Sequence, residues 1–123
     1  MSHAWDQNVP IYQQLRDRTV SHILAGRLKE GDLLPSVRQV AVDLQINPLT
    51  VSKAYQVLVD ESLVESQRGV GMRIKAGATH QLLEAERARF LSQDWPEILK
   101  RMEQLNLSFE DLPLPNNQKV SSQ

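Results

Sequence analysis

The sequence predicts a mostly α-helical protein with a small β-wing, and three observations carry this prediction. Two short amphipathic segments within residues 36–61 are separated by a tight turn. Two β-prone runs within residues 63–75 flank a glycine-rich tip. A further helical pattern of apolar residues covers residues 80–105. Two helices joined by a tight turn and followed by a hairpin indicate a winged helix-turn-helix, a unit that docks on duplex DNA.

The composition is typical of a soluble globular protein: of the 123 residues, 41% are hydrophobic and 24% are charged. No apolar run approaches the roughly 20 residues that a membrane-spanning helix needs. The start of the chain lacks the basic and apolar regions of a signal peptide. Without cysteine, the sequence offers no disulfide, thiolate nucleophile or cysteine-based metal site. These features predict a cytoplasmic protein.

The charge of the chain does not by itself indicate a nucleic-acid partner, because the formal net charge is −1. Residues 1–75 carry nine Lys and Arg against eight Asp and Glu, whereas residues 76–123 carry five against seven. The part with the helix-turn-helix pattern is therefore only slightly the more basic one. The prediction of DNA binding depends on the pattern of the motif and not on bulk charge.

The first helix is predicted over residues 9–25. Pro10 suits an initial helical position, and Gly26 is placed to end the helix. The connector that follows is rich in turn residues, and Leu33–Leu34 within it are expected to add a short strand to the wing. The apolar face of the helix is expected to comprise Ile11, Leu15, Ile23 and Leu24.

The second helix is predicted to start at Ser36 with a capping box, in which the hydroxyl accepts from the Gln39 amide and the Gln39 side chain reaches back. Its apolar face comprises Val37, Val40, Ala41 and Leu44.

The third helix is predicted to follow a turn at Gln45 and Ile46. Asn47 is a strong N-cap and Pro48 a strong first helical residue, so the helix should run from there to about Glu61. Its buried face is expected to comprise Val51, Ala54, Tyr55, Leu58 and Val59. Tyr55 is expected to pack in the core with its hydroxyl at the rim.

The wing is predicted as strands over residues 63–66 and 72–75, and Gly69 and Gly71 supply the positive φ angles that a tight hairpin needs. Residues 1–76 are therefore expected to form the winged helix-turn-helix domain.

Residues 77–112 are expected to form a helical dimerisation segment. A helix over residues 80–91 should be followed by a second one that Asp94 caps, with Pro96 near its first turn, and Ser108 gives a weaker signal for a final short turn. Two short helices cannot bury their apolar faces alone, so pairing with a second copy is favoured over packing back on the winged helix. The residues expected in this contact are Leu82, Leu83, Phe90, Trp95, Ile98, Leu99, Met102 and Leu105. Residues 113–123 are predicted to be a disordered tail.

Residues 10–75 resemble the DNA-binding domain of GntR-family transcriptional regulators. The resemblance is carried by PIYQQL, GRLKEGDLLPSVRQVA, TVSKAYQVL and LVESQRGVGMRI in this order, and the phrase INPLTVSKAYQVL with a short helical tail is similar to the YtrA-like subfamily. The resemblance implies a sequence-specific transcriptional regulator, a homodimeric repressor that binds an inverted-repeat operator in double-stranded DNA. Whether a small-molecule effector exists stays open.

The resemblance also implies the residues that contact DNA. Arg38 would reach bases or phosphates, Ser36 would start a helix that faces a phosphate, and Arg68 with Gly69 would enter the minor groove. Pro48 and Ser52 stand where many relatives carry arginine, which moves the contacts toward Arg38, Asn47 and Lys53, the last as a phosphate partner. The full predicted set is Ser36, Arg38, Asn47, Thr50, Ser52, Lys53, Arg68 and Gly69. Arg38 could instead be a solvated surface charge, and Thr50 and Ser52 ordinary polar surface. Asn47 is expected to cap its helix, with DNA contact as a second role, and Arg68 could instead stabilise the hairpin tip.

The sequence gives little support to an enzyme and leaves one other kind of binding protein open. His3, His22 and His80 are scattered without carboxylates at ligand spacing, and there is no nucleophile elbow, Walker loop or dinucleotide fingerprint, so no metal, cofactor or enzymatic activity is expected. The alternative is a winged-helix module that binds protein or RNA without specific DNA readout. Basic groups at both the helix start and the wing tip favour DNA.

Overall fold

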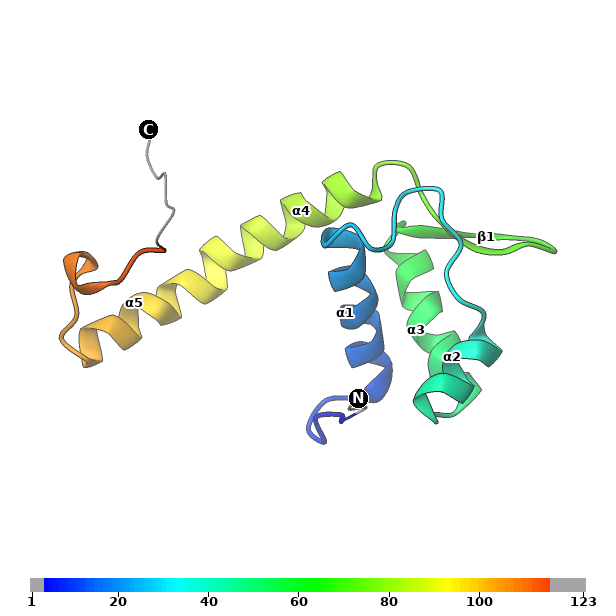
Figure 1. The fold of residues 1–123 in the computed structure, drawn as a ribbon, viewed down its shortest axis with the longest axis horizontal. Helices are drawn as coiled ribbons and strands as arrows, with labels where there is room; N and C mark the ends of the chain where they lie inside the picture. Colours follow the sequence, from blue (N-terminus) through cyan, green and yellow to red (C-terminus); the bar gives the residue numbers. More distant parts are fainter. Residues whose placement is uncertain (1–3, 116–123) are drawn as a thin grey trace. The chain divides into compact units, whose positions relative to one another are not determined.

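The computed structural model describes residues 4–115, and the chain divides into two compact units, Met1–Ala85 and Glu86–Gln123. The predicted fold class is confirmed: the described elements are mostly helices, with one two-stranded antiparallel sheet (Figure 1). In chain order they are α1 (Ile11–Leu24), α2 (Val37–Leu44), α3 (Pro48–Asp60), β1 (Val64–Gln67), β2 (Gly71–Ile74), α4 (Ala78–Arg89), the π-helix η1 (Phe90–Asp94), α5 (Trp95–Gln104) and the 3-10 turn η2 (Phe109–Asp111).

Pro10 was predicted to be the first residue of α1, but the helix begins one residue later, at Ile11. Pro10 has φ −55° and ψ 141°, so it precedes the helix as its N-cap. Gly26 adopts φ +81° just past the end of the helix, as predicted. Leu15 and Ile23 are buried, but Leu24 is 37% exposed and does not belong to the buried face.

The two helices of the helix-turn-helix are held at their starts by local hydrogen bonds. The Ser36 hydroxyl accepts from the amide of Gln39 over 3.1 Å, as predicted. The reciprocal half of the capping box does not form, because the Gln39 side chain donates instead to Asp43 over 2.8 Å. Gln45 makes the turn in the left-handed region, with φ 56°, and Asn47 caps α3.

The core of the first unit lies where α1 and α2 pack against α3 and where the hairpin closes over the end of α3. Helix α3 contributes the most completely buried side chains, since Val51, Ala54 and Leu58 have no exposed surface and Tyr55 is 3% exposed. Val59 is only half-buried. From the hairpin, Val64 and Ile74 pair across the strands and are each 1% exposed.

The wing is a short hairpin whose strands are each shifted by one residue from the predicted bounds. Gly69 and Gly71 have φ angles of +77° and +132°, as the tip requires. The strand expected at Leu33–Leu34 is reduced to an isolated bridge between Leu33 and Arg73.

The first unit continues past the boundary expected at residue 76, because the start of α4 packs into the winged helix. Ala78 and Leu82 are 1% and 3% exposed and belong to the core of the first unit. The Glu30 carboxylate accepts from the amide of Thr79 over 3.1 Å, and the Gln81 side chain donates to the carbonyl of Glu61 over 2.9 Å. These bonds join the first turns of α4 to two earlier loops.

In the second unit, Asp94 does not cap a new helix. Its φ of −75° and ψ of −44° are helical, and it makes no capping hydrogen bond through its side chain. The Trp95 amide donates to the carbonyl of Phe90, which gives the wide turn of the π-helix η1. Pro96 has no amide hydrogen for the regular α-helical pattern, which accounts for a local change of geometry rather than a break.

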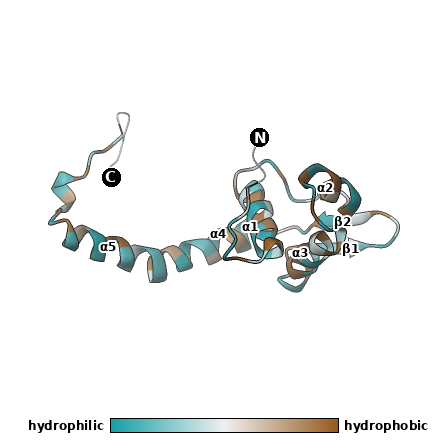
Figure 2. Ribbon diagram, turned by 90° about the horizontal axis from the view of Figure 1, so that it is seen from below, coloured by the Kyte–Doolittle hydropathy of each residue, from teal (hydrophilic) through white to brown (hydrophobic). Residues whose placement is uncertain are grey.

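The end of the described chain is a small cluster around α5 and η2. The rings of Trp95 and Phe109 stack with centroids 6.1 Å apart, and the amide of Ser108 donates to the carboxylate of Asp111 over 2.9 Å, which confirms the expected final turn. Hydrophobic and hydrophilic residues both occur along α5 (Figure 2). Of the predicted disordered tail, residues 113–115 have neither helix nor strand, and 116–123 lie outside the described residues.

Candidate nucleic-acid interface

Helix α3 has one buried side and one outward side. Asn47, before its first residue, accepts from the Leu49 amide through its side chain over 2.8 Å. Of the residues predicted to enter a DNA groove, Ser52 and Lys53 are exposed and Thr50 is half-buried. Leu49, which is not among the predicted contact residues, is 75% exposed on this helix. The one sequence feature that could have indicated its exposure is that Leu49 is apolar but does not follow the spacing of the helix's buried residues.

Arg38 lies in the first turn of α2 and is exposed. Within residues 4–115 its guanidinium has no hydrogen bond or ion pair. Ser36, just before the helix, is also exposed, but its hydroxyl already serves as the N-cap. The Ser36 side chain therefore holds the start of α2 in place, while the Arg38 side chain stays available for a partner outside the chain.

The predicted contact elements on α2 and α3 are joined through Tyr55. Its hydroxyl donates a hydrogen bond of 2.7 Å to the carbonyl oxygen of Pro35, the residue before Ser36. Burial raises the pKa of Tyr55 to about 12, so the hydroxyl keeps its donor proton well into the alkaline range. The predicted core packing of Tyr55 is confirmed. The bond ties the middle of α3 to the approach to α2.

Lys53 has a partner that the sequence did not indicate. Its ammonium group lies 4.2 Å from the centroid of the Tyr12 ring of α1. Such a contact restrains the side chain but leaves its positive charge uncompensated. Arg16 of α1 forms a second link, an ion pair of 2.8 Å with Glu61, the residue that follows α3.

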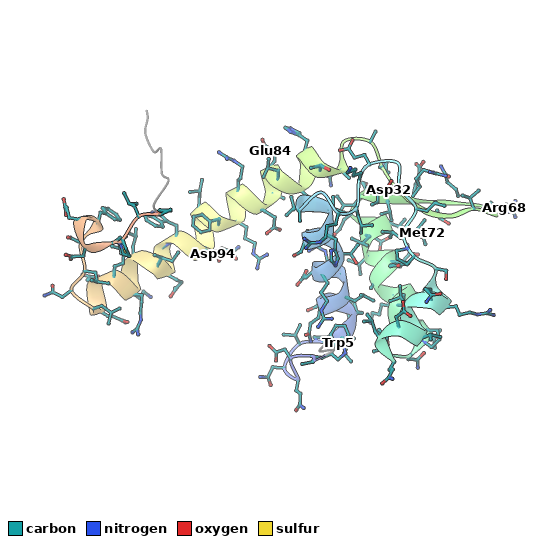
Figure 3. All side chains as sticks on the ribbon, viewed as in Figure 1. Trp5, Asp32, Arg68, Met72, Glu84 and Asp94 are labelled. Atoms are coloured by element: carbon teal, nitrogen blue, oxygen red, sulfur yellow. The ribbon has the colours of Figure 1, made fainter. Side chains whose placement is uncertain are left out.

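The tip of the wing presents Arg68 to solvent, and its side chain points away from the rest of the first unit (Figure 3). In the part of the chain that the structure describes, Arg68 has no ion pair or hydrogen bond. Arg73 differs, because its guanidinium donates to the Gln67 side chain over 2.8 Å and to the carbonyl of Gly31 over 2.5 Å. Apart from its two chain neighbours, no described residue has a heavy atom within 4 Å of the position that a Cβ would take at Gly69, so the backbone there is open to a close approach.

Other kinds of site find little support in residues 4–115. No group of three or more His, Asp or Glu side chains there could hold a metal ion, and no helix among them is long and apolar enough to cross a membrane. His22 accepts a hydrogen bond from Arg27 over 2.9 Å, and His80 is exposed on α4. His3 lies outside the described residues.

The residues predicted for a dimer contact differ in how exposed they are. Leu82 was expected in this contact, but it is 3% exposed and lies in the core of the first unit, where its own chain covers it. Met102 is 8% exposed and Trp95 is half-buried. The remaining members are between 40% and 50% exposed, namely Leu83, Phe90, Ile98, Leu99 and Leu105. Phe109 and Leu91, which the prediction did not include, are 59% and 60% exposed.

The sequence of this chain is similar to those of known transcription regulators. Residues 11–74 match the profile described as "Bacterial regulatory proteins, gntR family". The chain is 42% identical over 79 residues to the HTH-type transcriptional repressor YtrA of Bacillus subtilis, and it spans 61% of the length of that protein. It is also 28% identical over 112 residues to the HTH-type transcriptional regulator YhcF of the same organism, spanning 91% of it. These relatives are transcription regulators, in agreement with the expectation that the chain is not an enzyme.

Solved structures agree with the sequence comparison. A transcriptional regulator from Oenococcus oeni superposes with a TM-score of 0.73 at 31% identity, over 88% of each chain. The GntR-family factor YtrA from Sulfolobus acidocaldarius does so with a TM-score of 0.59 at 33% identity, over 86% of this chain and 99% of the other. With more than half of its residues matched to the family profile and its winged helix shared with these structures, the chain belongs to the GntR family of DNA-binding transcriptional regulators.

Proposed function

We propose that this GntR-family regulator is a repressor that binds an inverted-repeat operator as a homodimer. The observation that carries the proposal is the pair of arginines Arg38 and Arg68, which come from different elements of one winged helix. Both are exposed, and neither is paired within residues 4–115. Buried or paired arginines are structural, whereas free ones at a helix start and a wing tip suit phosphate and base contacts. The name of the Bacillus subtilis relative supports the repressor role.

Each predicted contact residue then has a role. Arg38 reads a base edge in the major groove, where a guanidinium meets the O6 and N7 atoms of guanine. Lys53 contacts a phosphate, since an ammonium acts as a point charge. Arg68 enters the minor groove beside Gly69, whose missing side chain allows close approach. The remaining polar contacts are assigned to Ser36, Asn47, Thr50 and Ser52.

The homodimer is supported by the exposed apolar residues of the second unit. Burying a large apolar side chain contributes roughly 1.5–3 kcal/mol relative to leaving it exposed. Leaving all the exposed members of the predicted contact in water is therefore unfavourable; in the second unit these are Phe90, Ile98, Leu99 and Leu105. A second copy related by a two-fold axis covers the same set on both chains. The same axis presents two recognition helices to the two halves of an inverted repeat. Leu82 is not part of this contact.

The second candidate is a winged-helix module that binds protein or RNA. The observation in its favour is the net charge of −1, which is low for a protein that binds a polyanion. A protein-binding module has no need of unpaired arginines on both α2 and the wing. For this reason we prefer the DNA-binding function.

The test is a gel-shift titration of the full chain with duplex DNA from upstream of its own gene, at fixed salt. A duplex of scrambled sequence and a single-stranded RNA of the same length serve as competitors. The proposal predicts a specific complex of two chains per duplex that the scrambled duplex does not displace, and reduced transcription from that promoter in vitro. Equal affinity for the scrambled duplex, or preference for the RNA, would favour the alternative.

A further inference from the structure

The outward side of α3 begins with an apolar side chain. Leu49 is the second residue of the helix and is 75% exposed, more than any other large hydrophobic residue within residues 4–115. Its backbone is held in place, because its amide donates to the Asn47 side chain over 2.8 Å. A large apolar side chain is therefore exposed at a well-defined position on α3, which under the proposed function is the recognition helix, the one that lies in the major groove.

The geometry of the helix directs Leu49 away from the core. Successive residues of an α-helix are about 100° apart, and the buried residues Val51, Ala54 and Leu58 mark the core side of α3. Leu49 falls on the opposite side, which it shares with Lys53 four residues later. Leu49 therefore points away from the core that Val51, Ala54 and Leu58 help to form, and its apolar surface is left to a partner outside the first unit.

The surroundings of Leu49 indicate what kind of partner that is. It is the only exposed large hydrophobic residue of α3, so the helix offers no apolar patch of the size that protein interfaces need. Its neighbour on this side is the cationic Lys53, and the first turn of α3 contains no acidic residue. A polyanionic surface with a single small apolar group matches both properties. The major groove of DNA is such a surface wherever thymine projects its C5-methyl group.

We infer that Leu49 is a specificity-determining residue that contacts the C5-methyl group of a thymine in each half-site. The inference rests on the proposed function, since it requires that α3 lies in the major groove of an operator. It adds what the polar residues do not supply, a preference for thymine over cytosine at one position of the half-site. Apolar contact distinguishes these pyrimidines because only thymine carries the methyl group.

The experiment replaces thymines of the bound duplex one at a time with deoxyuridine, which removes the methyl group and keeps every hydrogen-bonding group of the base. Removal of one buried methyl should weaken binding roughly fourfold (about 0.8 kcal/mol). Replacement at the symmetric position in both half-sites should then weaken the dimer roughly 15-fold. Leu49→Ala should bind the thymine and deoxyuridine duplexes equally. Val42→Ala is the matched control, because it shortens a 67% exposed apolar residue of α2, and it should keep the wild-type ratio.

The outcomes separate this inference from the proposed function. If the wild-type protein binds an operator but is insensitive to deoxyuridine at every position, or if Leu49→Ala keeps the wild-type sensitivity, Leu49 does not read thymine. A change of sedimentation in Leu49→Ala with an unchanged deoxyuridine ratio would identify a protein contact instead and also overturn the inference. Absence of any specific duplex binding by the wild-type chain would overturn the proposed function first. Circular dichroism of each variant verifies that it is folded.

Discussion

The hydroxyl of Tyr55 donates a 2.7 Å hydrogen bond to the carbonyl oxygen of Pro35, and this bond joins the recognition helix to the residue before α2. Tyr55 is 3% exposed whereas Pro35 is exposed, so the bond links the core of the first unit to its surface. The two predicted contact regions, the start of α2 and the outward side of α3, are thus linked by a residue of the core.

Tyr55→Phe should lower the free energy of unfolding by about 0.5–1.5 kcal/mol, since it removes one hydrogen bond whose acceptor belongs to an exposed residue. Denaturant titration measures this change. The matched control is Tyr12→Phe, which removes a hydroxyl that accepts a long, exposed hydrogen bond of 3.4 Å from the Gln13 side chain. This change should leave the free energy of unfolding nearly unaltered. Equal losses in the two variants would mean that the Tyr55–Pro35 bond has no special role in stability.

The same residue should make the fold sensitive to alkaline pH. Burial raises the pKa of Tyr55 to about 12 in the folded protein, whereas the unfolded chain loses the proton near the ordinary value of about 10. The unfolded state therefore binds fewer protons than the folded state between these values, and stability falls as the pH rises through that window. From about pH 9 to about pH 11, the wild type should lose about 1 kcal/mol more than Tyr55→Phe. Parallel losses in the two proteins would contradict the raised pKa.

Arg38→Ala should remove specific DNA binding and leave the fold intact, because Arg38 makes no hydrogen bond or ion pair with the described residues. Loss of a bidentate base contact in each subunit should reduce discrimination by roughly 2–6 kcal/mol per dimer. The measurement is the ratio of affinities for operator and random duplex at fixed salt. Arg27→Ala removes the same charge from a residue that is bonded to His22, and it should keep the ratio. An unchanged ratio in Arg38→Ala would exclude base reading by this residue.

Lys53→Ala should weaken binding to all duplexes alike. If each Lys53 neutralises one phosphate, the slope of log K against log salt should fall in magnitude by about two for the dimer. Tyr12→Leu removes the ring under the ammonium and keeps the charge, so it should weaken binding less and leave the slope unchanged. A sequence-selective loss in Lys53→Ala with an unaltered slope would identify it as a base reader.

Arg68 should prefer a narrow, A·T-rich minor groove, whose negative potential attracts a guanidinium. Replacing the base pairs under the wing with G·C should then weaken the wild type more than it weakens Arg68→Ala. The comparison uses two duplexes and two proteins at one salt concentration. If the replacement weakens both proteins equally, Arg68 does not sense the minor groove.

Leu99→Asp should convert the full-length protein from dimer to monomer, because it introduces a charge into the exposed apolar set of the second unit. Sedimentation at micromolar concentration measures this, and binding to a duplex with two half-sites should weaken while binding to one half-site is retained. Val42→Asp is the control, since it charges an exposed residue of α2 instead. A shortened chain for comparison should end after Ala85, because ending it at residue 76 would remove Ala78 and Leu82 from the core. A Leu99→Asp protein that stays dimeric would move the dimer contact elsewhere.

Local sequence determined most of the winged helix. The starts of α2 and α3 follow from Ser36 and Asn47, whose side chains accept from amides only two or three residues away. The hairpin follows from Gly69 and Gly71, whose positive φ angles are a property of the residue type. Such features depend on near neighbours, and a sequence pattern describes near neighbours well.

Only the tertiary structure decided which residues those elements meet. Leu82 is apolar at helical spacing whether it faces the winged helix or a second copy, and its place in the core depends on α4 being joined to residues far away in the chain. One of these is Glu30, whose pKa is lowered by hydrogen bonds from the amides of Gly77 and Thr79. The contacts of Lys53 with Tyr12 and of Tyr55 with Pro35 likewise cross between elements. Residue spacing carries no information on contacts of this kind, because they form only when the helices pack.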